Sequence, residues 1–195
     1  MQKENKAASP RVVRAVKIPI LITLLAVPPC HAWQAPAPYS LTAQGTQEVA
    51  FSPNAGATEL VVKVIDAAQQ SIRLAAYSFT SKPIAEALVA AHKRGVDVQV
   101  VVDKSQRTER YTSATFLANM GIPVRVDAMH AIMHNKFIVV DGQHVQSGSY
   151  NYSKAAEERN AENAVVNWNS PRLAAIYTDN WRLHWDHSEP YQARY

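Results

Sequence analysis

Apolar residues recur along this chain with two different periods, which predicts helices and strands in alternation. Residues 58–70 and 82–94 carry apolar side chains three and four positions apart, the spacing of one face of an α-helix. Residues 71–79 and 96–102 are instead runs of apolar and β-branched side chains, which are typical of buried strands. A helix therefore precedes each of these two strands.

The same patterns continue over the rest of the chain and predict the fold class. Asp141 and Gly142 form a favoured two-residue hairpin turn between two predicted strands. Alternating helices and strands favour an α/β fold, a mixed β-sheet sandwiched between helices on both faces. The further strands are predicted at residues 48–52, 123–126, 136–140, 144–146 and 164–168, and the further helices at residues 113–120 and 171–185.

The beginning of the chain differs from the rest. Basic residues precede an apolar run at residues 18–27, and small residues follow it, as in a cleavable export signal. The run is too short to span a bilayer, and a buried amphipathic helix is the alternative. We therefore predict an export signal at residues 1–32, a loose Pro-rich segment at residues 33–47 and one folded domain at residues 48–195. The expected location is periplasmic or secreted, with no stable membrane association after removal of the signal.

The export signal also holds the only cysteine and the excess charge. Without Cys30 the mature chain would have no disulfide and no thiolate chemistry. Residues 1–32 have a net charge of +4, equal to that of the whole chain. The remainder is neutral, with 15 of the 20 basic and 15 of the 16 acidic residues. A polyanion would therefore have to be attracted by local clusters of basic residues.

Two short segments concentrate the residues that can do chemistry. In a strand, His134 and Lys136 point to the same face, so an imidazole and an ammonium group lie side by side. A phosphate group could contact both of them. Gly148 allows the backbone to approach a ligand closely, and Ser149 and Asn151 can direct a hydroxyl and an amide toward the same phosphate oxygens.

The pattern His-x-Lys-x4-Asp-x6-Gly-Ser-x-Asn, from His134 to Asn151, resembles the signature of the phospholipase D superfamily, and every fixed position matches. The resemblance extends over residues 48–185 to the small bacterial endonucleases of that superfamily. It implies a phospholipase D-like fold and a histidine nucleophile that forms a phosphohistidine, with a second histidine as acid and base. It also implies that Lys136 and Asn151 stabilise charge on the five-coordinate phosphorus, without a metal or other cofactor.

The number of motif copies predicts the oligomeric state. Larger members of the superfamily carry two copies of the motif, whereas this chain has one and shows no internal repeat. One copy supplies only one of the two histidines. The expected solution is a homodimer with a shared active site through which the two-fold axis passes.

Other motif residues have structural alternatives. Asp141 is a candidate catalytic residue by its place in the motif, but its odd offset from Lys136 puts it on the other strand face, so we favour a structural role. Ser149 and Asn151 could instead cap the following helix. By the resemblance, Glu162 matches the carboxylate that hydrogen-bonds the catalytic histidine, with a plain surface glutamate as the alternative.

A polar loop after one strand supplies the candidate substrate-binding cations. Lys104, Arg107 and Arg110 lie in this loop, at the end of a strand where α/β proteins commonly bind ligands. They could bind phosphates along a nucleic-acid backbone, with Tyr111 available to stack on unpaired bases. An ordinary solvated loop is the alternative.

No metal site is predicted. His130 and His134 are four residues apart but lack the central glutamate of a metalloprotease motif. His184 and His187, with Asp186 between them, are interpreted as a solvated helix end, with metal binding by these three residues as the alternative.

Together these features predict a metal-independent endonuclease that hydrolyses DNA, with RNA as a further candidate, through a phosphohistidine and with low sequence specificity. A phospholipase D-type lipid phosphodiesterase is the first alternative, although no exposed apolar entrance or membrane-binding element is evident. A catalytically silent nucleic-acid-binding protein is the second, and the intact His134 and Lys136 argue against it.

Overall fold

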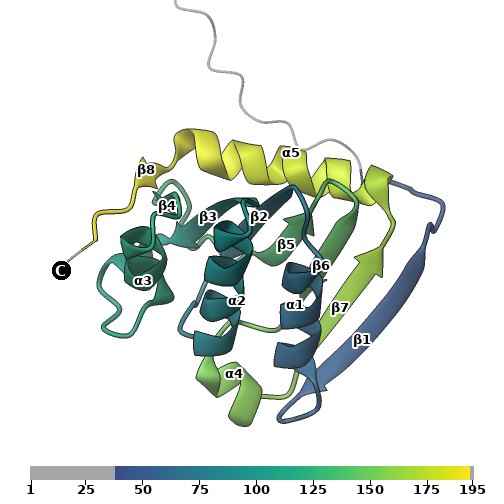
Figure 1. The fold of residues 1–195 in the computed structure, drawn as a ribbon, viewed down its shortest axis with the longest axis horizontal. Helices are drawn as coiled ribbons and strands as arrows, with labels where there is room; N and C mark the ends of the chain where they lie inside the picture. The colour runs from purple at the N-terminus through teal and green to yellow at the C-terminus, as the bar shows by residue number, and fades with distance from the viewer. Residues whose placement is uncertain (1–37, 194–195) are drawn as a thin grey trace, which may run out of the picture. The chain divides into compact units, whose positions relative to one another are not determined.

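The computed structural model describes residues 38–193, in which helices pack against an eight-stranded sheet (Figure 1). The predicted export signal lies outside the described residues. The strands are β1 (Thr46–Ser52), β2 (Ser71–Ala76), β3 (Asp97–Asp103), β4 (Val124–Asp127), β5 (Lys136–Val140), β6 (His144–Gly148), β7 (Glu162–Trp168) and β8 (Glu189–Pro190). The helices are α1 (Ala57–Asp66), α2 (Lys82–Lys93), α3 (Ser113–Asn119), α4 (Lys154–Glu158) and α5 (Pro171–His187), with a 3₁₀ helix η1 at Lys104–Arg107.

The sheet is mixed, as predicted. Its strand order is β1-β7-β6-β5-β2-β3-β4-β8. Strands β2, β3 and β4 run parallel to one another, and the other neighbours are antiparallel. Ala76 pairs with Lys136, and Gly148 pairs with Ala164. These registers bring the end of β2, the start of β5, the end of β6 and the start of β7 to the same end of the sheet.

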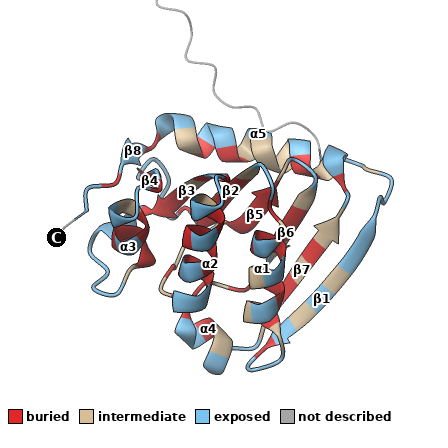
Figure 2. Ribbon diagram, in the orientation of Figure 1, coloured by how far each residue is buried: buried red, intermediate tan, exposed pale blue. Residues whose placement is uncertain are grey.

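Helices cover both faces of the sheet, so the predicted sandwich is confirmed. Successive residues of a strand point to opposite faces. Ile138 and Val140 of β5 join the core that includes buried residues of α1 and α2. Phe137 and Val139 pack on the other face with Trp181 of α5. Figure 2 shows buried residues along the strands and on the helix surfaces turned toward them. Each fully buried side chain of this size contributes about 1.5–3 kcal/mol relative to exposure.

Helix α1 ends at Asp66, earlier than the predicted end at residue 70. The backbone N–H groups of Gln69, Gln70 and Ser71 donate instead to the carboxylate of Asp141, each at 2.8 Å. These N–H groups therefore have a partner outside the helix, and the chain turns directly into β2.

Several strand boundaries also differ from the prediction, and contacts with other segments explain two of them. Strand β2 ends at Ala76 and not at residue 79, because Phe79 forms an isolated bridge with Tyr152 after a bend. Strand β1 begins at Thr46, inside the segment predicted to be loose, because it pairs with β7 along its whole length. Among residues 38–193, no helix has the length and apolar character needed to cross a membrane.

Candidate active site

The spacing of the motif is explained by three strand ends that meet at one end of the sheet. Lys136 begins β5, Gly148 ends β6 and Glu162 begins β7, and these strands are antiparallel neighbours. A cavity of about 510 Å³ opens at this point. It is lined by His134, Lys136, Gly148, Ser149, Asn151 and Glu162, together with Asn135, Phe137, Ser147 and Tyr177.

His134 and Lys136 lie side by side, as predicted. His134 is exposed just before β5, whereas Lys136 is only 8 % exposed. The Lys136 ammonium donates to the backbone carbonyl of His134 at 2.7 Å and lies 3.0 Å from its Nδ1. Because an ammonium group can only donate, Nδ1 accepts, and the proton of the neutral imidazole is on Nε2. This contact thus favours the Nε2–H tautomer of His134.

Tyr77, at the end of β2, supports this pair. Its ring lies 4.5 Å from the His134 ring, measured between centroids, and the Lys136 ammonium lies 5.4 Å from the Tyr77 centroid. The aromatic face therefore contacts both functional groups and limits their movement. Sequence reasoning gave Tyr77 no role, since the residue lies far from the motif along the chain.

The charge of Lys136 is held in a poorly solvated position. Burial lowers the pKa of Lys136, and the negative charge of Glu162 opposes this effect. An ammonium group that has lost part of its water shell interacts more strongly with an anion in the cavity. A phosphate oxygen is the kind of group that could compensate for the lost hydration.

Glu162 is not hydrogen-bonded to His134, the partner that was predicted for it. Its carboxylate accepts from the side chain of Asn160 at 3.1 Å, whereas Nδ1 of His134 faces Lys136. The predicted hydrogen bond to the histidine is therefore not formed in this structure, because the ammonium occupies that position. Glu162 lines the cavity and acts on Lys136 through its charge.

Asn151 presents an unused polar atom to the cavity. Its side-chain oxygen is buried and has no hydrogen-bond partner among the described residues. A buried polar atom without a partner costs about 1–3 kcal/mol, so this oxygen is available to a donor of a ligand, while the NH₂ group of the same amide is the part that can donate to a phosphate oxygen. The helix-capping alternative for Ser149 and Asn151 is wrong, because the hydroxyl of Ser153 accepts from the N–H of Ala156 and caps α4.

The hydroxyl of Ser149 is partly used. Its oxygen accepts from the backbone N–H and the side-chain amide of Asn163, at 3.1 and 3.2 Å. The hydroxyl hydrogen can still be donated, since a serine hydroxyl is both donor and acceptor. Ser149 can therefore join β7 to the cavity and contact an oxygen of a ligand.

Gly148 has a different role from the one expected. Its φ is +147°, and a Cβ placed there would lie 2.2 Å from the backbone oxygen of Asn163. The glycine is thus required for the close approach of β7, and not chiefly for the approach of a ligand. It still borders the cavity through its backbone.

Asp141 lies outside the cavity. It is at the other end of β5 from Lys136, which is roughly 16 Å away at about 3.3 Å per residue. Its carboxylate accepts three backbone N–H groups from the turn between α1 and β2. Grouping Asp141 with the catalytic residues is therefore wrong, and the structural interpretation accounts for its contacts.

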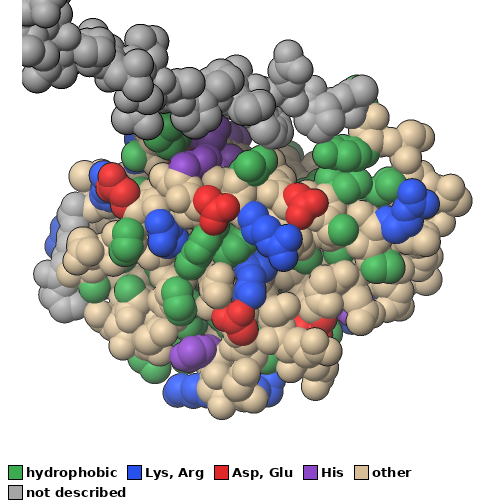
Figure 3. All heavy atoms as spheres, turned by 90° about the horizontal axis from the view of Figure 1, so that it is seen from above, with side chains coloured by type: hydrophobic (Ala, Val, Ile, Leu, Met, Phe, Trp, Pro, Cys, Tyr) green, Lys and Arg blue, Asp and Glu red, His purple; other side chains and the backbone are tan. Residues whose placement is uncertain are grey.

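The basic loop is close to the site only in part. Lys104 begins η1 and donates to the backbone oxygen of His130 at 3.0 Å, while the guanidinium of Arg110 stacks on Tyr111. Arg107 forms an ion pair with the exposed Glu189, and its use for phosphate binding stays a prediction. None of the three side chains lines the cavity. Figure 3 shows basic and acidic side chains interspersed on one face of the molecule, without one large basic field.

The prediction of a solvated helix end at the end of α5 is wrong for His184, which is buried. His184 is only 8 % exposed, and its Nδ1 lies 2.7 Å from the Asp127 carboxylate. Asp186 is not part of this contact. The partner carboxylate comes from β4, far away in the sequence.

Comparison with known proteins accounts for this arrangement of the motif. The sequence profile of the family described as cardiolipin synthase, PLD-like domain, matches residues 61–185. The chain belongs to the phospholipase D family. "Phospholipase D" of Rickettsia conorii is 37 % identical over 131 residues, which are 67 % of this chain and 65 % of that protein. The chain thus spans slightly less than two thirds of the length of such relatives.

Solved structures of the phospholipase D family have the same fold. Nuc from Salmonella typhimurium, a phospholipase D family member, is 45 % identical and superposes with a TM-score of 0.74, covering 76 % of this chain and 99 % of that chain. NucT from Helicobacter pylori superposes with a TM-score of 0.67 at 22 % identity, covering 74 % of this chain and 98 % of that chain. The family and the fold predicted from the motif are confirmed.

Proposed function

We propose that this protein is a metal-independent phosphodiesterase that acts as an endonuclease on DNA, with RNA as a further candidate and with little sequence preference. The observation that carries the proposal is the contact of His134 with Lys136 at the cavity, beside Asn151, whose side-chain oxygen has no partner among the described residues. A nucleophile, a cation and a neutral hydrogen-bonding group converge where one phosphate group fits.

The reaction follows from these groups. Phosphate binding draws the Lys136 ammonium from His134 to a phosphate oxygen, and the unprotonated ring nitrogen of His134 attacks phosphorus. The bond from phosphorus to one ester oxygen breaks, and a second, protonated histidine gives its proton to the leaving oxygen. That histidine then takes a proton from water, and the resulting hydroxide displaces His134 from phosphorus. Lys136 and Asn151 stabilise the charge on phosphorus in both steps.

The choice of a nucleic acid rests on several features. The cavity borders polar groups, and Lys104 and Arg110 lie in a loop at the same end of the sheet. The chain covers 99 % of Nuc at 45 % identity, whereas it covers 65 % of the Rickettsia phospholipase D.

A lipid phosphodiesterase is the second candidate, because Met129 and Ile132, in the loop before His134, are 73 % and 54 % exposed. Such side chains could enter a lipid surface.

One assay compares the candidate substrates. The purified protein is incubated with plasmid DNA, with RNA and with vesicles that contain a phosphatidyl ester, each in excess chelator. We expect cleavage of DNA to persist, since protein side chains supply every group that contacts phosphorus in the proposed mechanism. Hydrolysis of the vesicle lipid alone would favour the second candidate. Complete loss of activity in chelator would contradict the metal-independent mechanism if circular dichroism shows the chelated protein to be folded and the His130→Ala/His187→Ala variant is still active without chelator.

We also propose that the active site is shared between two subunits. Of the residues that line the described cavity, one is a histidine, whereas the mechanism needs two. A two-fold axis beside the exposed His134 would supply the second from the partner subunit.

Mixing subunits tests this arrangement. Wild-type and His134→Ala chains are refolded together in equal amounts, so that only about one quarter of the dimers carry both histidines. Activity is then expected to fall to about one quarter of that of an all-wild-type sample. A His92→Ala chain, altered on α2, is the matched control and should cause no loss. A fall to one half, as for independent active sites, would exclude the shared site.

A further inference from the structure

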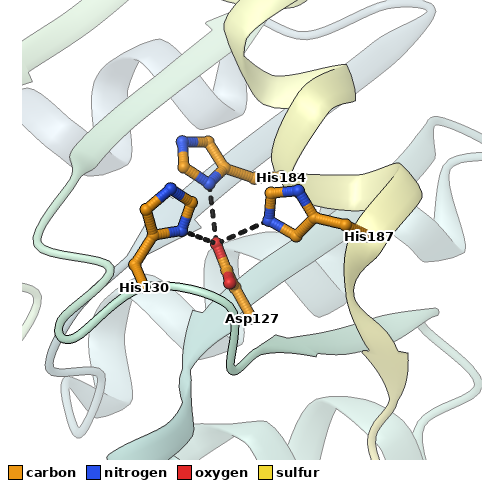
Figure 4. A group of neighbouring side chains, drawn as sticks. All are labelled: Asp127, His130, His184 and His187. Atoms are coloured by element: carbon orange, nitrogen blue, oxygen red, sulfur yellow. Dashed lines mark hydrogen bonds and ion pairs between the residues drawn. The ribbon is translucent and has the colours of Figure 1, made fainter. Parts of the chain in front are cut away.

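A cluster of one carboxylate and three imidazoles lies outside the candidate active site (Figure 4). Asp127 ends β4, and His130 follows it in the adjoining loop. His184 and His187 lie at the C-terminal end of α5, three residues apart. The cluster therefore joins the loop before β5 to the last turn of the last helix.

The four side chains converge on one point. The Oδ2 atom of Asp127 lies 2.7 Å from His184 Nδ1, 3.0 Å from His187 Nε2 and 3.1 Å from His130 Nδ1. A carboxylate oxygen has about two lone-pair sites, so three ring nitrogens are more than it can accept as good hydrogen bonds. The other carboxylate oxygen already accepts the N–H of Met129 at 2.9 Å.

The same four atoms fit the coordination of a metal ion. One ligand atom from each residue lies within 4.8 Å of all the others. Zinc bound to nitrogen and oxygen at about 2.0–2.2 Å in a tetrahedron places neighbouring ligand atoms roughly 3.3 Å apart. To admit an ion, the Asp127 oxygen would withdraw from among the three nitrogens, and ligand atoms that now lie up to 4.8 Å apart would close to that spacing by rotation of their side chains.

We propose that Asp127, His130, His184 and His187 bind one zinc ion. Three imidazoles and one carboxylate are typical ligands of zinc, whereas calcium and magnesium prefer oxygen ligands. Four protein ligands complete a tetrahedron, which is typical of a structural site and not of a catalytic one.

The proposed ligands also interact electrostatically with one another. Burial raises the pKa of Asp127, but hydrogen bonds from His187, His184 and the Met129 N–H outweigh it and hold that pKa well below its usual range. Burial lowers the pKa of His184 more than the neighbouring Asp127 raises it. Metal binding needs the carboxylate and the neutral imidazoles, so binding of an ion would displace the protons that now lie between Asp127 and the histidines.

The proposed ion would also act on the loop that carries His134. His184 Nε2 lies 3.1 Å from the side-chain amide of Asn135, which lines the active-site cavity next to His134. With zinc on Nδ1, the His184 proton must be on Nε2, so Asn135 has to present its oxygen to that proton. Zinc would in this way fix the orientation of a residue that borders the cavity, without taking part in the reaction.

Binding to the full chain tests the proposal. Protein freed of metal by dialysis against a chelator is titrated with Zn²⁺ in a calorimeter, and its thermal midpoint is measured with and without Zn²⁺. We expect one ion per chain and a higher midpoint in its presence, because a ligand that binds only the folded state stabilises it. Co²⁺ in place of Zn²⁺ should give the strong visible absorption of tetrahedral coordination.

The variant His130→Ala/His187→Ala removes two ligands. These side chains are 48 % and 30 % exposed, so the fold should tolerate their loss. We expect zinc affinity to fall by more than about 100-fold, beyond the loss seen when a residue that only supports a ligand is removed. The matched variant His92→Ala/His134→Ala also lacks two histidines but keeps all four ligands, and should bind zinc as the wild type does.

Two results would overturn the proposal. One is the absence of both binding heat and a midpoint shift with Zn²⁺, and the other is equal zinc affinity in the two double variants. These readouts do not depend on hydrolysis, so a failure of the zinc proposal is separate from a failure of the proposed function.

Discussion

Replacement of His134 by alanine is expected to lower phosphodiester hydrolysis by a factor on the order of 10⁴ or more. His134 is the exposed imidazole of the cavity, and no other histidine lines it in the described chain. In a shared site the substitution removes the nucleophile and the acid together, because both are copies of the same residue. The measurement is the initial rate of plasmid cleavage at equal concentrations of folded protein.

Two controls make this result interpretable. His92→Ala changes a histidine on α2 and should keep the wild-type rate. Circular dichroism of the His134→Ala protein should be unchanged, since the exposed ring contributes to packing chiefly through its contact with Tyr77. A well-folded His134→Ala protein that cleaves at the normal rate would refute the assigned nucleophile.

Replacement of Asp141 by alanine is expected to lower the free energy of unfolding by about 2–4 kcal/mol, because three backbone N–H groups lose a charged acceptor. For a chain of this size the thermal midpoint should fall by roughly 5–15 °C. The rate per folded molecule should remain close to that of the wild type, since Asp141 lies at the far end of β5 from the cavity. Denaturant unfolding and cleavage assays on the same sample separate the two effects.

Asp66→Ala is the matched control for Asp141. Asp66 is exposed at the end of α1, close to the same turn, and its loss should change stability by less than about 0.5 kcal/mol. An Asp141→Ala protein of normal stability but greatly reduced rate would restore a catalytic role for this residue.

Strands that are buried on both faces of the sheet were predictable from the local sequence. Strand β5 agrees with the prediction at both ends, because its residues alternate between the two cores and the Asp141-Gly142 turn ends it. The position of Lys136 follows from the same alternation, whereas His134 lies in the loop just before the strand. Their spacing of two residues needs no information from the rest of the chain.

Contacts between distant segments were not predictable in this way. Asp127 and His184 are 57 residues apart, and Asp141 reaches backbone groups 70 to 72 residues before it. The three-residue spacing of His184 and His187 was visible on the predicted helix, but the carboxylate that both histidines contact, that of Asp127, comes from the end of β4. Similarly, the need for glycine at residue 148 depends on a backbone oxygen of β7. Such contacts depend on how distant segments pack together, and the local spacing of apolar residues along the sequence carries no information about this packing.

The placement of β1 has a consequence for how the protein folds. This strand lies at one edge of the sheet and pairs with β7, with Thr46 opposite Trp168. During synthesis β1 emerges early but has no partner until β7 has also left the ribosome. Contacts between such distant segments slow folding, and the unpaired strands are exposed to aggregation in the meantime. Closure of the sheet is thus a late, whole-chain event, while the local β5–β6 hairpin can form much earlier.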